Sequence, residues 1–246
     1  MAKSNFFKMS SNHAITLILV ALIVASMALS VHFYNDMPDK MATHWDSHEV
    51  ANGWTSKDVA LFMFPTILGL LTVIFLLIPN IDPLKQNLLK FERQFGVFMI
   101  LLSTFIIVIQ AQVISWNKGI PISPSFITTI ALGILFFYAG TLLKKSKRNY
   151  FIGIRTPWTL NSDYVWEKTH RVGSILFKIA AIIFIFSSLL KGITSWIIII
   201  TVFSLVIITM IYSYTLYIKE EKSKLEDKNI VSKKAHSKKR AIKKIK

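Results

Sequence analysis

The chain has 246 residues, of which 53% are hydrophobic, and it carries a formal net charge of +16 at pH 7. A soluble domain of this length could not bury so much apolar surface, so the composition excludes a soluble globular protein and indicates a membrane protein. Cysteine is absent, which excludes disulfides, thiol nucleophiles and thiolate metal sites.

Six apolar runs approach the length of about 20 residues that a helix needs to cross a bilayer. None alternates strictly between polar and apolar residues as a membrane barrel strand would. The first run follows Lys3 and Lys8 as a signal peptide would, but it is longer than a signal core and indicates an uncleaved helix. We therefore predict an all-α integral membrane protein with six transmembrane helices. The predicted spans are 14–33, 59–79, 95–115, 126–143, 174–190 and 195–218.

Basic residues are divided unevenly between the polar segments. Of the 29 Lys and Arg residues, 24 lie in the N-terminal tail, the second and fourth loops and the C-terminal tail. The other loops hold only Lys40, Lys57, Lys118 and Lys191. Because basic residues concentrate on the cytoplasmic side of membrane proteins, this division predicts that both termini are cytoplasmic.

The first loop, residues 34–58, is the longest segment on the predicted outer side. It has five acidic residues and two Lys, a net charge of −3, and would attract a cationic peptide. Trp45 and Trp54 are either anchors for such a peptide or residues of the membrane interface. We predict that Trp45, Asp46, Glu49 and Trp54 face an external peptide toxin.

Metal-ligating residue types also occur in this loop, as His44, His48 and Glu49, and histidines four residues apart share a helix face. Pro38 and Asn52-Gly53 favour a loop rather than a helix here, and no third His follows at zinc-site spacing. We interpret the histidines as surface residues and predict no metal site and no cofactor.

Local patterns mark the expected ends of several helices. Thr55 and Asp58 have the spacing of a capping box for the second span. Asp82 and Ser123, each followed by Pro, suit the starts of the helices that lead into the third and fourth spans. Pro65 removes a backbone donor and should kink the second span toward a neighbour that satisfies the freed carbonyl.

Polar residues are rare within the spans. Gln110, Gln112 and Lys178 could line a path through the membrane, which leaves a small transporter or channel as the alternative function. The two glutamines lie on different faces of one helix, and Lys178 can reach the membrane surface. Gly69 should permit close approach of a neighbouring helix. No span offers a Ser-Lys, paired-Asp or His-rich set, so we predict no enzyme.

The fourth loop, residues 144–173, is the most specific part of the chain, and we call it the signature loop. Gly153 allows backbone angles that other residues resist, and Pro157 holds Thr156 extended. Residues 151–160 are therefore expected to form a strand-like or re-entrant turn rather than a helix.

A helix should follow, capped by Asn161 or Ser162, with Trp166 and His170 on one face. The residue types alone suit an interfacial hinge that packs two helices as well as a binding surface.

The segment FIGIRTPWTL, followed by Trp166, closely resembles the signature of the SdpI-type bacterial toxin-immunity membrane proteins. The matching residues are Gly153, Arg155, Thr156, Pro157, Trp158, Thr159, Leu160 and Trp166. The first loop resembles a small uncharacterised N-terminal module that often accompanies that family, through Met37-Pro38, His44-Trp45, Gly53-Trp54 and Ser56-Lys57. Family members commonly have Gly where this chain has His48-Glu49-Val50.

The resemblance implies a multi-pass protein of the bacterial plasma membrane that gives immunity to a secreted membrane-active peptide toxin. It also implies signalling, in which the toxin-bound protein sequesters a small transcriptional autorepressor at the membrane. The matching residues, with Arg171, are then expected to bind the cytoplasmic partner.

Three regions follow from these observations. Residues 1–120 are predicted to form a three-helix module with the first loop, and residues 121–218 an SdpI-like three-helix module with the signature loop. Residues 219–246 hold twelve basic and four acidic residues. They are predicted to be a solvated, disordered cytoplasmic tail attracted to anionic lipid by about 1 kcal/mol per basic residue, with no direct nucleic-acid binding.

Overall fold

The computed structural model describes the backbone of residues 5–120, 122–190 and 192–243, and the side chains of residues 13–120, 122–190 and 192–230. Some of the basic residues counted above lie outside the described residues, namely Lys3, Lys191, Lys244 and Lys246.

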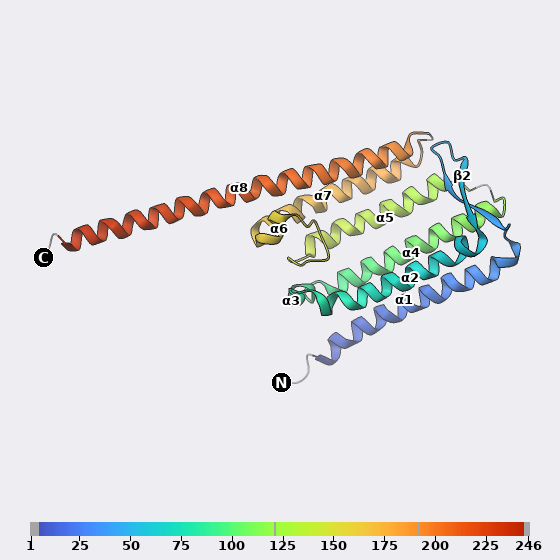
Figure 1. Cartoon of the computed structure of the whole chain (residues 1–246), viewed down its shortest axis with the longest axis horizontal. Helices are drawn as coiled ribbons and strands as arrows, with labels where there is room; N and C mark the ends of the chain where they lie inside the picture. Colours follow the sequence, from blue (N-terminus) through green and yellow to red (C-terminus); the bar gives the residue numbers. More distant parts are fainter. Residues whose placement is uncertain (1–4, 121, 191, 244–246) are drawn as a thin grey trace.

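Six long helices run side by side (Figure 1). Each is long and apolar enough to cross a membrane, which confirms the prediction of six transmembrane helices. They are α1 (Asn5–Phe33), α2 (Lys57–Ile81), α4 (Glu92–Asn117), α5 (Pro124–Lys145), α7 (Asp163–Ser187) and α8 (Thr194–Lys243). The two other helices, α3 (Lys85–Leu88) and α6 (Pro157–Asn161), are short.

The helices pack in two groups. α1, α2 and α4 contact one another, α7 lies against both α5 and α8, and the contact between α4 and α5 joins the groups. The start of α1 and the end of α8 point toward the same end of the bundle, as an even number of spans requires (Figure 1). We call this the signature-loop end and the opposite one the hairpin end. Which end faces the cytoplasm stays a prediction.

The first loop forms a small antiparallel hairpin of β1 (Lys40–Trp45) and β2 (Ala51–Ser56), after a 3-10 turn at Tyr34–Asp36. β1 lies against the end of α4. There the Asn117 side chain donates to Ala42 O at 3.0 Å and accepts from Ala42 N at 2.8 Å. The sequence did not predict this hairpin, which adds two strands to an otherwise helical fold.

A polar joint holds α1 against α2 at the proline of α2. Pro65 cannot donate to Leu61 O, and the hydroxyl of Ser30 donates to that carbonyl at 2.7 Å. This confirms that a neighbouring helix satisfies the freed carbonyl. No neighbouring helix approaches closely at Gly69, because a Cβ there would meet no atom within 4 Å. The expectation of close approach at Gly69 is wrong.

The predicted helix starts are confirmed in part. Ser123 caps α5 by accepting from the backbone N–H three residues on, at 3.2 Å. The capping box of Thr55 and Asp58 is wrong, because Ser56 is the cap residue of α2 and its side chain makes no cap bond. Asp58 instead accepts from the Tyr34 hydroxyl at 2.7 Å, a contact from outside the helix.

α8 continues through the Lys-rich segment as a helix of 50 residues. At 1.5 Å per residue it is about 75 Å long, more than twice the hydrocarbon thickness of about 30 Å. Lys224 pairs with Glu220 at 3.1 Å and with Glu221 at 2.9 Å, one helical turn away. Lys and Glu favour helices, and such pairs stabilise them. The prediction of a disordered tail from residue 219 is therefore wrong for the part that the structure describes.

Candidate functional site

Asn149 fixes the first turn of the signature loop. Its side chain is fully buried. The side-chain oxygen accepts from Phe151 N at 2.9 Å and Ile152 N at 2.7 Å, and the side-chain nitrogen donates to Lys147 O and Ile152 O at 2.8 Å each. One amide therefore pairs four backbone groups, which fixes the course of the chain where it leaves α5.

The loop next docks onto α7 through His170. Ile154 N donates to His170 Nε2 at 3.0 Å, while His170 Nδ1 donates to Trp166 O at 2.7 Å. Because Nε2 accepts, the imidazole is neutral and carries its proton on Nδ1. Gly153, with φ of 126°, lies against this ring so closely that a Cβ would overlap Nε2. Only glycine combines that backbone angle with that approach.

Trp166 completes the docking surface. Its side chain is 2% exposed, stacks on the His170 ring at a centroid distance of 4.0 Å, and donates from Nε1 to Ser146 O at 3.3 Å. The prediction that Trp166 and His170 share one face of a helix is confirmed. The two rings form a buried platform under the backbone of the loop.

The second half of the signature segment is helical. Thr156 and Thr159 form a capping box, in which each side chain accepts from the other residue's backbone N–H, and Pro157 occupies the first helical position of α6. The expected strand-like turn over residues 151–160 is therefore wrong from Pro157 onward. Thr156 also bonds Ser213 on α8 at 3.2 Å.

Contacts of Trp158 and Arg148 then hold α6 against the rest of the bundle. The ring of Trp158 lies 5.1 Å from that of Tyr214 on α8. Arg148 donates to Leu160 O at 2.9 Å and pairs with Asp163 at 2.7 Å. The predicted cap at Ser162 is confirmed, since its hydroxyl accepts from the N–H of Val165 at 3.2 Å.

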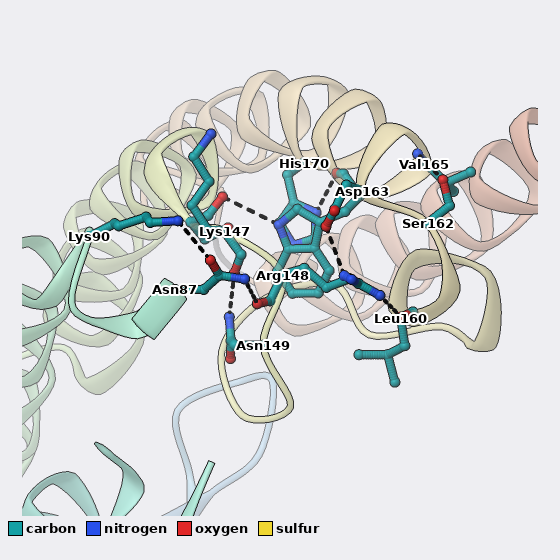
Figure 2. Close-up of polar contacts among 12 residues, drawn as sticks. Asn87, Lys90, Lys147, Arg148, Asn149, Leu160, Ser162, Asp163, Val165 and His170 are labelled. Carbon is teal, nitrogen blue, oxygen red and sulfur yellow. Dashed lines mark hydrogen bonds and ion pairs between the residues drawn. The ribbon is translucent and has the colours of Figure 1, made fainter. Parts of the chain in front are cut away.

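The loop between α2 and α4 holds the signature loop from the other side (Figure 2). Asp82, 3% exposed, accepts from Tyr150 N at 3.0 Å and from Leu84 N at 2.6 Å. Asn87 donates to Arg148 O at 2.9 Å and accepts from Lys90 at 3.0 Å. The first helical group is thus hydrogen-bonded to the signature loop of the second. Asp82 is the cap residue at the end of α2, and residues 82–91 contain only the single helical turn of α3. The expected helix that starts at Asp82 and leads into the third span is therefore wrong.

At the hairpin end, the acidic residues of the first loop have specific contacts. Asp46 accepts from His48 N and Val50 N at 2.9 Å each and closes the turn between the strands. Glu49, at φ of 65°, accepts a hydrogen bond from Ser123, the cap residue of α5. Positive φ favours glycine, which accounts for the Gly common at this part of the resembling module.

The two tryptophans of the first loop differ in environment. Trp45 is half-buried and meets the ring of Trp116 edge to face at 5.5 Å, so it packs on α4. Trp54 is 58% exposed on β2. Of the two predicted aromatic anchors, only Trp54 presents most of its surface outside the protein.

Comparison with known proteins connects this geometry to a family. Residues 145–213 match the SdpI/YfhL protein family, from the end of α5 through the signature loop and α7 into α8. Residues 21–69, which include the hairpin, match a domain of unknown function, DUF1648. Both matches confirm the resemblance seen in the sequence.

The chain is also 22% identical to the immunity protein SdpI of Bacillus subtilis (strain 168) over 176 residues, covering 72% of this chain and 82% of that protein. No solved structure matches. Together with the six spans, the SdpI-family likeness identifies a multi-pass protein of the cell membrane.

The residues that match the signature, together with Arg171, have three kinds of environment in the structure. Gly153, Thr156, Thr159 and Trp166 have the packing and hydrogen-bonding contacts described above. Trp158 and Leu160 are half-buried. Arg155, Pro157 and Arg171 are exposed, and Arg155 donates to Tyr150 O at 2.5 Å.

The sequence argument missed Asp82, Asn87 and Arg148 as members of this site. Asp82 and Tyr150 are 68 residues apart, and local patterns carry no information on such a pairing. The sequence offers one signal, the carboxylate of Asp82 in the short polar segment between two apolar spans. Because Pro83 follows it, Asp82 has the pattern of a helix start.

Proposed function

We propose that this chain is a membrane immunity protein that gives resistance to a secreted membrane-active peptide toxin. The observation that carries the proposal is the likeness to an immunity protein, which extends over 72% of the chain and includes the SdpI-family signature loop. The six spans place such a protein in the membrane that the toxin attacks.

The hairpin end supports a site for the toxin. A pocket of about 410 Å³ lies beneath β1 and between α4, α5 and α8. Its lining includes Trp45, Asp46, Gln112 and Thr128, which offer an aromatic surface, a carboxylate and hydrogen-bonding groups. The net charge of −3 on the first loop favours a cationic peptide. Exposed Trp54 supplies an apolar contact on the same loop.

The opposite end supports a signalling role. With both termini in the cytoplasm, the signature loop faces the cytoplasm as well. The buried residues of the loop hold a rigid backbone, and Arg155 and Arg171 are exposed on it. Two exposed guanidinium groups, of which that of Arg155 is held by Tyr150 O, suit carboxylates on a partner protein, because each offers a planar set of donors. We assign the sequestration of a small repressor to this surface.

A transporter or channel is less well supported by the described residues. Gln110 is fully buried between α1 and α4, where its side chain bonds both Ser26 and Ser30. Gln112 instead accepts from Thr128 at 3.1 Å, and Lys178 lies over the ring of Phe137 at 5.3 Å. All three polar side chains thus contact a neighbouring helix, and the three contacts lie between different pairs of helices.

The test is survival of a toxin-sensitive Bacillus strain that lacks its own immunity protein. Cells that express this chain should survive secreted membrane-active peptides better than cells with an empty vector, with the Bacillus subtilis immunity protein as the positive control. Arg155→Ala should keep wild-type membrane abundance and protection but lose induction of a repressor-controlled reporter. Loss of all protection at normal abundance would contradict the division of roles, and no protection by the wild type would contradict the proposal.

A further inference from the structure

A second cavity, of about 290 Å³, lies at the signature-loop end between the two helical groups. It opens where α5 ends, next to the start of α7 and the loop after α3. Its charged lining is mainly basic, with Lys90, Lys144, Lys147 and Arg148, while Asp163 and Glu167 are the acidic members. The cavity therefore has a net charge of +2.

The charges are only partly neutralised within the protein. Arg148 pairs with Asp163 at 2.7 Å. Lys90, Lys144 and Lys147 have no carboxylate within 4 Å among the described residues, and Lys90 donates only to the neutral side chain of Asn87. Figure 2 shows the ammonium group of Lys90 directed to Asn87 and that of Lys147 directed away from it. Three exposed lysines thus line one cavity without a carboxylate partner, and they favour an anionic ligand.

An apolar crevice adjoins this cavity. It has a volume of about 330 Å³ and lies between α2, α4, α5 and α7, on the membrane side of the signature loop. Leu143 lines both spaces and so lies between them. Phe98, Ile152 and Phe177 are among the other crevice residues, and its exposed lining surface is predominantly apolar.

We propose that this pair of spaces binds one anionic phospholipid, with its phosphate in the basic cavity and an acyl chain in the adjoining crevice. Lysine ammonium groups are phosphate binders, and basic pockets between membrane helices take anionic head groups. The apolar crevice favours a lipid over free phosphate, because each methylene buried there adds to the binding and free phosphate has none. Both helical groups line the site, so the lipid joins them beside the Asp82 and Asn87 contacts.

Binding to the purified full-length protein in detergent tests this site by native mass spectrometry. Phosphatidylglycerol should bind at least tenfold more tightly than phosphatidylcholine. The double variant Lys90→Ala/Lys147→Ala should bind it about 25-fold more weakly, from about fivefold per lysine. The control is Lys85→Ala/Lys145→Ala, which removes the same charge from exposed positions on neighbouring elements outside the cavity, and it should change binding less than twofold.

A second arm separates the lipid from its head group. Inorganic phosphate and glycerol phosphate, at millimolar concentration and matched ionic strength, should leave phosphatidylglycerol bound. Displacement by either would show a site for free phosphate and overturn the lipid assignment. An equal loss of binding in the two double variants would show general surface attraction, and no preference over phosphatidylcholine would also refute the proposal. These outcomes do not depend on the toxin.

Discussion

Replacing Gly153 with alanine should separate the signature loop from α7. At φ of 126° an L residue is strained by about 1–3 kcal/mol. The added Cβ would overlap His170 Nε2, so the ring must move and the bond from Ile154 N must break. A buried donor left unpaired costs a further 1–3 kcal/mol or so. The total loss of stability is about 2–6 kcal/mol.

The chain supplies a matched control in Gly69→Ala. This glycine lies inside α2 with no positive φ, and its new Cβ would meet no atom within 4 Å. Alanine favours a helix by about 1 kcal/mol over glycine, so this variant should be as stable as the wild type or slightly more stable.

Thermal unfolding of the two variants in the same detergent is the assay. At roughly 2–4 °C per kcal/mol for a chain of this size, Gly153→Ala should lower Tm by about 4–24 °C. Gly69→Ala should leave Tm unchanged or raise it. If both variants unfold with the wild type, the loop is not fastened to α7 through His170 and the reasoning is refuted.

Three further predictions follow from other contacts. Asn149→Asp replaces the side-chain NH2 group, which donates to two carbonyls, with an oxygen that repels them. It should lower Tm by several degrees, and an unchanged Tm would contradict the role of the amide. Ser30→Ala leaves Leu61 O without its donor and should cost about 1 kcal/mol in denaturant unfolding; a cost near zero would show that the joint is unimportant. Single cysteines at exposed His48 and Lys168 should differ in labelling by an impermeant thiol reagent on intact cells, the first reacting and the second protected, and equal labelling would end the proposed orientation.

The sequence predicted those parts of the fold that depend on local chemistry. Apolar runs of membrane-spanning length gave the six helices, and Ser123 and Ser162 cap helices through backbone groups three residues away. The box at Thr55 failed because α2 begins one residue later than the pattern requires, with Ser56 as its cap residue, and Asp58 bonds the distant Tyr34 instead. The hairpin was missed because its strands have six residues each and their pairing is irregular around His44.

The site shows the same division. The resemblance singled out Gly153 and Trp166, whose roles lie within the loop and the helix that follows. Asp82 and Asn87 act on the loop from 68 and 61 residues away, and one sequence gives no sign of these pairings. The prediction of a disordered tail is wrong because a lysine-rich composition indicates a solvated segment but does not exclude a helix. Lys and Glu also favour the helical conformation.

Protection of the membrane potential is the most direct test of the proposed immunity function. A voltage-sensitive dye would report depolarisation of toxin-sensitive cells as a secreted membrane-active peptide is added, with and without this chain at verified membrane abundance. The account predicts that cells containing the chain keep their potential at peptide concentrations that depolarise the controls. Equal depolarisation in both, with the Bacillus subtilis immunity protein still protective in the same strain, would contradict it.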